Sequence, residues 1–297
     1  MINKIYVFSL FLTALLLSNN VFGANKLNSL THCNIIPLPQ KATFTDGNFQ
    51  LNNRTTILFQ DNDMDFLSLY LKNELKYKSE ISIRKANCKV SKTYKNSIQL
   101  QLEEGFSDEA YKIEINSGKI TCKASTKAGL FYAVQSLLQS IRLENNKWVI
   151  PCMSIEDSPR FAWRGFMLDE SRHFFGKKVV IEYLEIMGKL KLNRFHWHLS
   201  DEQGWRIEIK KYPLLTQIGS IGCWDDSKAD AAFYTQEDIK EIVEFASQRN
   251  IMIIPEIDMP GHATAITRSY PELSGGGTGR WNGFTFHPTK ETTYEFI

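Results

Sequence analysis

Three short apolar runs in the second half of the chain each end in acidic residues or histidine, and this repeated pattern is what most constrains the fold. The runs and their polar ends occupy residues 164–175, 193–205 and 253–262. Between them, at residues 177–191 and 236–249, apolar side chains recur at helical spacing. Alternating strands and helices favour a parallel sheet whose polar side chains gather at the carboxyl ends of the strands. The pattern therefore predicts βα units with a site at one edge of the sheet, which is either open or closed into a barrel.

The elements of this half can be placed from the same pattern. We expect strands at residues 166–168, 195–199 and 251–254. The helix at residues 236–249 has a clear start, because Thr235 is a good N-cap residue and acidic side chains in its first turn suit the positive end of the helix dipole.

The first half of the chain predicts a small α+β domain. Several of its runs alternate apolar and polar residues, as in a sheet that is covered on one face. We expect strands at residues 55–60, 97–103, 110–116 and 120–124, and helices at residues 65–76 and 127–142. No residue of this half has the marks of catalysis. Two prolines and a short acidic turn at residues 151–159 mark a boundary, which gives a domain at residues 24–158 and a second at residues 159–297.

The N-terminus has the pattern of a secretory signal peptide. Lys4 precedes an apolar run at residues 5–17, and Gly23 supplies a small residue at a cleavage point. The run is shorter than the roughly 20 apolar residues of a membrane-spanning helix. We therefore expect residues 1–23 to be removed, no stable membrane anchor, and export to the periplasm, the cell surface or the medium.

Composition excludes some classes of function. The chain is 43% hydrophobic and 23% charged, with a formal net charge of +2, so nothing attracts a nucleic acid electrostatically. Five cysteines are scattered with no close pair, which gives no zinc-ribbon or redox spacing. We expect mostly buried or free thiols at these positions: Cys33, Cys88, Cys122, Cys152 and Cys223.

Two histidines in the second predicted strand are candidates for chemistry. The period of two in a strand places His196 and His198 on the same face. With Asp201 and His262 they could chelate a metal, as in metal-dependent hydrolase barrels. The alternative is that the imidazoles are hydrogen-bonded inside a polar barrel centre. We favour this alternative and expect no metal and no other cofactor.

Three motifs in chain order, RGFMLDESRHFF, FHWHLSDEQGW and PEIDMPGH, resemble those of the family 20 glycoside hydrolases, the β-N-acetylhexosaminidases. The similarity covers almost all of residues 34–297, and IIPLP and AGLFYAVQSLLQ are similar to the family's non-catalytic α+β domain. Such long motifs are more specific than a lone glycine pattern. The resemblance implies an α/β fold, a partial TIM (β/α)8 barrel with about three βα units, preceded by a small α+β domain.

The resemblance also implies a reaction. Terminal non-reducing N-acetylglucosamine or N-acetylgalactosamine is removed from β-linked glycans with retention, because the acetamide oxygen of the substrate attacks the anomeric carbon. The family supplies a general acid and a neighbouring acid as an Asp-Glu pair after the fourth strand. That pair, in its H-x-G-G-D-E context, is not in this sequence, and residues 293–297 resemble the start of the helix before it. We therefore expect a C-terminally truncated fragment that is inactive alone.

The motifs match several supporting residues of the family. Arg172 matches the arginine that binds sugar hydroxyls, although an ion pair with Asp169 is an alternative role. Asp201 and His262 match a pair that supports the general acid through a hydrogen-bond relay. Four residues are candidates for a supporting layer: Asp169, His198, Glu256 and Asp258.

Two other functions stay open at this point. One is a metal-dependent hydrolase built on His196, His198 and His262, and the other is a non-catalytic carbohydrate-binding remnant that retains Arg172. Four tryptophans are candidate platforms for stacking on a sugar, with core packing as the favoured role of the first: Trp197, Trp205, Trp224 and Trp281.

Overall fold

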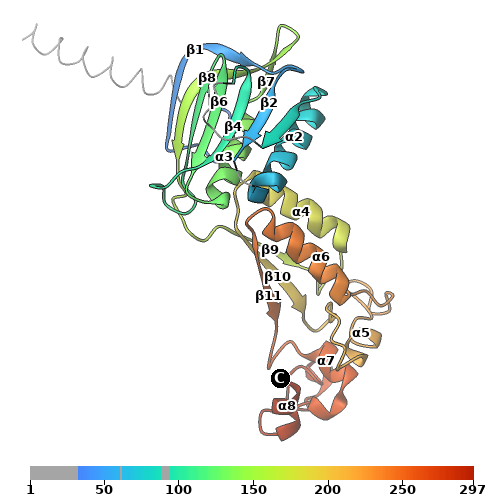
Figure 1. The fold of residues 1–297 in the computed structure, drawn as a ribbon. Helices are drawn as coiled ribbons and strands as arrows, with labels where there is room; N and C mark the ends of the chain where they lie inside the picture. The colour runs from blue at the N-terminus through green and yellow to red at the C-terminus, as the bar shows by residue number, and fades with distance from the viewer. Residues whose placement is uncertain (1–32, 61, 88–93) are drawn as a thin grey trace, which may run out of the picture. The chain divides into compact units, whose positions relative to one another are not determined.

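The computed structural model describes residues 33–60, 62–87 and 94–297, and the chain divides into two compact units between Arg160 and Phe161 (Figure 1). The predicted signal peptide, residues 1–23, and Cys88 lie outside the described residues. Within the described ranges, no helix is long and apolar enough to cross a membrane.

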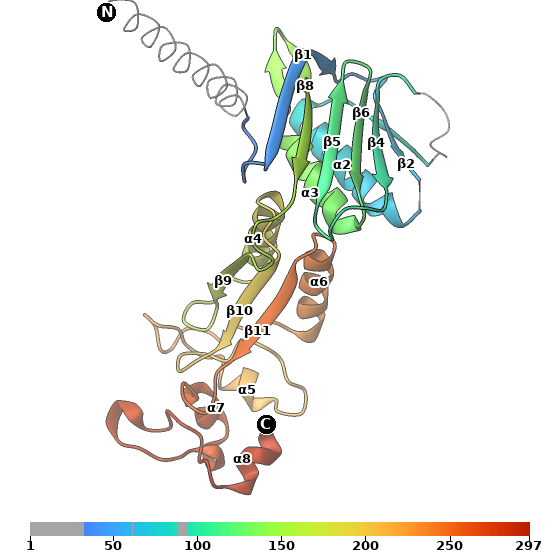
Figure 2. The ribbon, with the colours of Figure 1, turned by 90° about the vertical axis from the view of Figure 1, so that its left-hand side faces the viewer.

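The first unit is a mixed sheet covered by two helices. The strand order is β1-β8-β5-β6-β4-β2-β3, with β7 paired to β8. Figure 2 shows α2 and α3 on the same face of this sheet. The bounds are β1 Lys41–Gln50, β2 Thr56–Phe59, β3 Arg84–Asn87, β4 Ser97–Leu102, β5 Tyr111–Asn116, β6 Lys119–Ala124, β7 Arg142–Glu144, β8 Lys147–Asp157, the 3-10 helix η1 Asn62–Met64, α2 Asp65–Ser79 and α3 Lys127–Gln139.

Helix α3 lies in the core of this unit, since Leu130, Val134 and Leu137 are fully buried in a cluster to which the sheet and α2 also contribute. The helix begins where Thr126 accepts a hydrogen bond from the backbone of Gly129. The strands and helices expected in this unit are confirmed, each within a few residues.

The expected division between residues 158 and 159 lies two residues before the division between the compact units. Most of residues 151–159 nevertheless belong to β8, which continues to Asp157 and is mostly buried. Pro151 is tolerated because β5 begins to pair with β8 only at Met153, and β1 has a bulge between Phe44 and Asn48, the partner of Pro151. A proline that lacks N–H is compatible with such an irregular position.

The second unit is built on three parallel strands in the order β11-β10-β9. Helices α4 and α6 follow β9 and β10 and pack together against one face of the sheet (Figure 1). The expected βα units and the α/β class with partial barrel content are confirmed. The bounds are β9 Gly165–Asp169, β10 Arg194–Ser200, β11 Met252–Ile257, α4 Lys177–Lys189, α5 Leu214–Gln217, α6 Gln236–Ser247, α7 Thr264–Ser269, η2 Pro271–Leu273, η3 Gly279–Trp281 and α8 Glu291–Phe296.

The two faces of this sheet differ in character. Trp197 on β10 is buried with Leu184 of α4 and Ile242 of α6. Helix α6 begins with a complete capping box between Thr235 and Asp238, as expected from the sequence. The opposite face carries the polar side chains of the strand ends.

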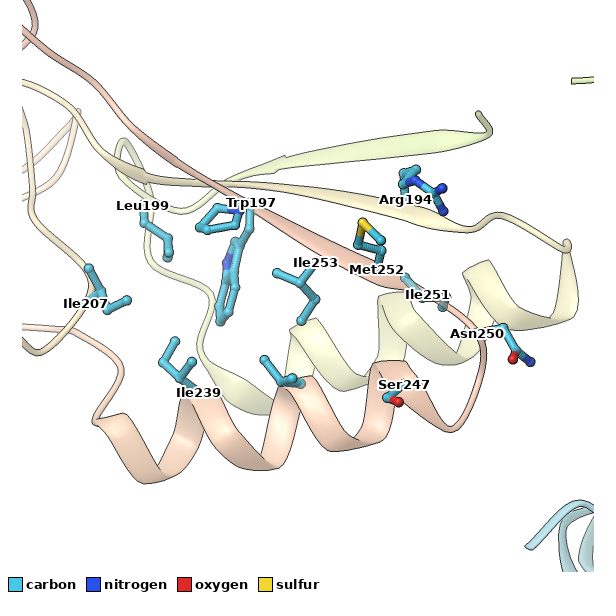
Figure 3. Close-up of a pocket in the computed structure, with 12 residues that line it drawn as sticks. Arg194, Trp197, Leu199, Ile207, Ile239, Ser247, Asn250, Ile251, Met252 and Ile253 are labelled. Atoms are coloured by element: carbon cyan, nitrogen blue, oxygen red, sulfur yellow. The ribbon is translucent and has the colours of Figure 1, made fainter. Parts of the chain in front are cut away.

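An apolar pocket of about 610 Å³ lies between β11 and α6 (Figure 3). Trp197, Ile239 and Ile253 line it, and Arg194 is its one charged lining residue among the described part of the chain. Strands β9 and β11 have no further strand partner within the described residues. Because the pocket lacks acids and histidines, it is not the candidate active site.

Candidate active site

The carboxyl ends of the three parallel strands bring the polar residues of the motifs together. Asp169 on β9, His198 on β10 and Glu256 on β11 lie side by side in the strand register. Side chains at matched positions of a parallel sheet point to the same face. The sheet therefore places an acid, a histidine and an acid in a row, and the loops after the strands add the rest of the cluster.

Arg172 lies in the loop after β9 and is held by two carboxylates. Its Nη1 is 2.8 Å from Asp169 Oδ2, and its Nη2 is 2.6 Å from Asp201 Oδ2. The ion pair with Asp169 thus exists, but it does not use all the N–H donors of the guanidinium, and the Arg172 side chain is 34% exposed. Arg172 is fixed in place with part of its planar donor array toward solvent, as a ligand site requires.

Asp201 is the centre of the cluster, with a side chain that is only 1% exposed. Its Oδ2 faces Arg172 and His198, while its Oδ1 is 3.0 Å from His262 Nδ1 and accepts the backbone N–H of Glu202. Burial alone would raise the pKa of this carboxyl, but these hydrogen bonds and the Arg172 charge outweigh it and lower the pKa. Asp201 is therefore a stable carboxylate.

His198 lies between two acids. Its Nε2 is 3.1 Å from Asp201 Oδ2 and its Nδ1 is 3.0 Å from Glu256 Oε2. Burial acts to lower the pKa of the imidazole, yet the hydrogen bonds to Asp201 and Glu256 prevail and raise it. The imidazolium form can donate to both carboxylates at once.

Glu256 and Asp258 complete the row at β11. Burial and the neighbouring Glu256 carboxylate raise the pKa of Asp258, whereas hydrogen bonds from His198, Asp258 and His196 lower that of Glu256 against the effect of burial. Asp258 is thus the acid of the pair that favours its protonated form, from which it can donate a hydrogen bond to the Glu256 carboxylate. His196 lies on the same face as His198, as predicted, and its Nε2 also contacts Glu256.

His262 is held in an unusual backbone conformation. Its φ is +53°, in the left-handed region that a non-glycine residue seldom adopts. The ring of Phe284 packs edge-on against the imidazole with centroids 5.0 Å apart. Because Nδ1 is directed at Asp201, the Nε2 atom can form a hydrogen bond with a second group. The His262 side chain is 44% exposed.

All seven residues that the sequence singled out therefore lie in one cluster, but sequence reasoning missed the layer beneath it. Glu170 is fully buried and accepts hydrogen bonds from Tyr234 Oη and the backbone of Phe175, each at 2.7 Å. Burial raises its pKa. Glu170 thus points away from its neighbour Asp169, and the two do not form a pair of adjacent catalytic acids.

Arg206 is the second missed residue. Its guanidinium is buried and donates to five backbone carbonyls, those of Glu170, Ser171, Ser220, Gly222 and Ala232. These carbonyls belong to the loop that carries Arg172 and to the long segment after β10. No sequence signal marks an isolated arginine as buried, since arginine is mostly exposed.

The tryptophans separate into two groups. Trp197 and Trp205 are 1% and 4% exposed and pack in the core, whereas Trp224 and Trp281 are 69% and 51% exposed. The backbone N–H of Trp224 donates to the carbonyl of Arg172 at 2.8 Å. Of the two exposed tryptophans, Trp224 is therefore the one that a backbone hydrogen bond holds beside Arg172, the candidate sugar-binding residue.

The three histidines of the metal-dependent alternative are not brought together around one point. Among the described residues, the groups that could hold a metal do not unite His196, His198 and His262. The space between Asp169 and Asp201 is taken by the guanidinium of Arg172. A fixed cation already neutralises the carboxylates that would bind a metal ion there.

Comparison with known proteins gives two family models that together match most of the chain. The description "Glycosyl hydrolase family 20, catalytic domain" matches residues 161–297, and "Glycosyl hydrolase family 20, domain 2" matches residues 32–158. The chain is 36% identical over 251 residues to a beta-hexosaminidase of Porphyromonas gingivalis, which covers 81% of this chain and 32% of that protein.

Two solved structures are similar over both units. A GH20 exo-beta-N-acetylglucosaminidase of Vibrio harveyi, in complex with N-acetylglucosamine, aligns with a TM-score of 0.79 and 30% identity, over 89% of this chain and 43% of its own. The GH20 beta-N-acetylhexosaminidase of Streptomyces coelicolor gives a TM-score of 0.79 and 32% identity, over 89% and 56%. The chain thus spans between about a third and just over half the length of these relatives.

Proposed function

The chain belongs to glycosyl hydrolase family 20, and from this premise we propose that its strand-end cluster binds the terminal N-acetylhexosamine of a β-linked glycan, which the whole protein hydrolyses. The observation that carries the proposal is Arg172, held by Asp169 and Asp201 with part of its guanidinium exposed. A planar array of donors fixed at one orientation suits neighbouring sugar hydroxyls.

The second part of the proposal concerns proton transfer. Asp201 is a buried carboxylate that holds His262 through Nδ1, so that the imidazole orients its other nitrogen toward a reacting group. Such a pair adjusts the pKa of a general acid without touching the substrate. Asp201 and His262 are thus positioning residues, and the acetamide oxygen of the substrate serves as the nucleophile.

Sugar binding is testable on this chain directly. Replacement of Arg172 by alanine removes charge-assisted hydrogen bonds, each worth about 1.5–3 kcal/mol, so we expect N-acetylglucosamine to bind roughly 10-fold to 100-fold more weakly. Isothermal titration calorimetry measures the affinity. Arg54→Ala, at an exposed arginine of the first unit, is the matched control and should leave binding unchanged. Equal affinity of the two variants would remove Arg172 from the sugar site.

Turnover is a separate matter. The sequence has no Asp-Glu pair in the family context, and Glu170 is turned into the core toward Tyr234. We therefore expect that this chain hydrolyses a chromogenic β-N-acetylglucosaminide no faster than buffer alone does. If the parent chain releases the chromophore and Arg172→Ala does not, another acid of this chain protonates the leaving oxygen.

We also propose that the protein is exported, on the strength of Lys4 and the apolar run at residues 5–17. Expression in a bacterial host and N-terminal sequencing of the extracytoplasmic product tests it, with cleavage expected after Gly23. A product that keeps residues 1–23 inside the cell would contradict the proposal.

A further inference from the structure

A second cluster of side chains, outside the sugar-binding candidate, joins the loops after β9 and β10. His173 follows Arg172 in the first loop, and Cys223 and Asp225 lie in the second. The donor atoms of the three side chains all lie within 4.8 Å of one another. Cys223 Sγ is 3.1 Å from Asp225 Oδ1, and His173 Nδ1 is 3.7 Å from the same oxygen.

These separations suit a tetrahedral metal ion. Zinc binds sulfur at about 2.3 Å and nitrogen or oxygen at about 2.0–2.2 Å, so two of its ligand atoms are about 3.5 Å apart. The thiolate, imidazole and carboxylate set favours zinc over magnesium or calcium, which prefer oxygen ligands. Three protein ligands leave the fourth position to water or another small ligand.

Backbone hydrogen bonds within the second loop hold the turn that carries Cys223 and Asp225. The N–H of Cys223 donates to the carbonyl of Asp226, and that of Gly222 to the carbonyl of Ala229, at 2.8 and 2.9 Å. Gly222 has a φ of +92°, and a Cβ there would lie 2.8 Å from a backbone oxygen. These contacts hold Cys223 and Asp225 on one turn, where Cys223 Sγ and Asp225 Oδ1 are 3.1 Å apart.

The cluster is held from below and is open to solvent. The guanidinium of Arg206 donates to the carbonyl of Gly222, directly before Cys223, at 2.7 Å. His173 and Asp225 are exposed, with side chains 46% and 72% accessible, so an ion can reach them from solvent.

We propose that His173, Cys223 and Asp225 form a binding site for a single zinc ion. The ion would tie the loop that carries Arg172 to the loop that carries Trp224, two segments already joined by a hydrogen bond from Trp224 N to Arg172 O. Cysteine spacing could not reveal this site, because Cys223 and Asp225 lie 50 and 52 positions after His173 in the chain.

The test is a titration of the metal-stripped chain with Zn²⁺ in competition with a chromogenic chelator. We expect one equivalent to bind, no competition from Mg²⁺, and at least tenfold weaker binding in Cys223→Ser, His173→Ala and Asp225→Asn. The matched control is Cys33→Ser, which changes another free, partly buried cysteine and should bind like the parent chain.

Substitution with Co²⁺ supplies a readout specific to the thiolate. A sulfur-to-cobalt charge-transfer band is expected in the parent chain and not in Cys223→Ser, with circular dichroism verifying that each variant is folded. The proposal is overturned if no zinc binds, if Cys223→Ser retains the affinity, or if binding is lost instead in His262→Ala, which would assign the ion to Asp201, Glu202 and His262.

Discussion

At the scale of single residues, the buried carboxylate of Asp201 decides how the candidate site responds to acid. Four groups converge on its two oxygens: Arg172, His198, His262 and the backbone N–H of Glu202. Removing one partner of a buried charge cluster costs about 3–5 kcal/mol, because the remaining charges lose their compensation.

The stability contribution of Asp201 should therefore depend on pH. Its pKa is lowered in the folded chain, so the stabilisation is present above the unfolded value of about 3.9 and is lost as the pH falls through the folded value. Denaturant unfolding of the parent and of Asp201→Asn should differ by about 3–5 kcal/mol at pH 7, and the gap should close in acid. Asp169→Asn, at a carboxylate that is 29% exposed, should cost less, and a gap independent of pH would contradict the assignment.

His198 gives a prediction of opposite sign. Its pKa is raised by Asp201 and Glu256 despite burial, so its contribution is complete below the unfolded value of about 6.5 and is lost as the pH rises through the folded value. Titration of the imidazole by NMR should place the midpoint above that value. Glu256→Gln should lower it, whereas Glu241→Gln, at an exposed acid that pairs with Lys177, should not.

Among the site residues, the sequence predicted those that obey a simple geometry. Strand periodicity put His196 and His198 on one face, and the strand ends put Asp201 and Asp258 at one edge. Glu170 and Arg206 could not be found in this way, since their partners are a tyrosine 64 residues away and backbone carbonyls that only the folded loops bring together. Burial of a charge depends on tertiary contacts, which no local pattern contains.

At the scale of elements, Arg206 is the group that joins the loops under the site. Replacement of Arg206 by methionine leaves up to five carbonyls without their donor. Each unsatisfied buried group costs about 1–3 kcal/mol, so we expect a loss of at least about 3 kcal/mol in the free energy of unfolding.

The same variant should also weaken N-acetylglucosamine binding, because Ser171, next to Arg172, supplies one of the carbonyls. Denaturant titration and calorimetry measure the two effects. Arg54→Met is the control and should stay within about 0.5 kcal/mol of the parent. Unaltered stability of Arg206→Met would mean that water replaces the guanidinium.

Strand β8 shows how local composition and sheet pairing act on the same segment. Pro151 and the acids of residues 156–157 have the composition of a linker, and local composition was the basis for the expected boundary. The neighbours β1 and β5 supply the hydrogen bonds that extend the strand to Asp157. Pairing with β1, whose residues lie about 100 positions earlier in the chain, keeps most of this segment in a strand, and the division between the units follows directly after it.

At the scale of the whole molecule, the second unit exposes an apolar surface beside β11. Val243 and Met252 are 46% and 56% exposed and both line the pocket between α6 and β11. An open strand edge next to exposed apolar side chains favours self-association.

We therefore expect the chain to bind an environment-sensitive apolar dye and to associate with increasing concentration. Val243→Lys and Met252→Lys should reduce dye fluorescence and the mass seen by light scattering. Tyr77→Lys removes an aromatic side chain that is 88% exposed in the first unit and should have little effect. A monomer that binds no dye would show that this surface does not drive association.

The guanidinium of Arg206 donates its hydrogen bonds to backbone carbonyls, whereas that of Arg172 is paired with carboxylates. Protonation of Asp201 in a strongly acidic medium, below its lowered pKa, therefore weakens the contacts of Arg172 and leaves the hydrogen bonds of Arg206 in place. A preparation brought to low pH for a short time should lose its affinity for N-acetylglucosamine and regain it on neutralisation. The loops held by Arg206 keep their conformation, so the ion pairs of Arg172 can form again.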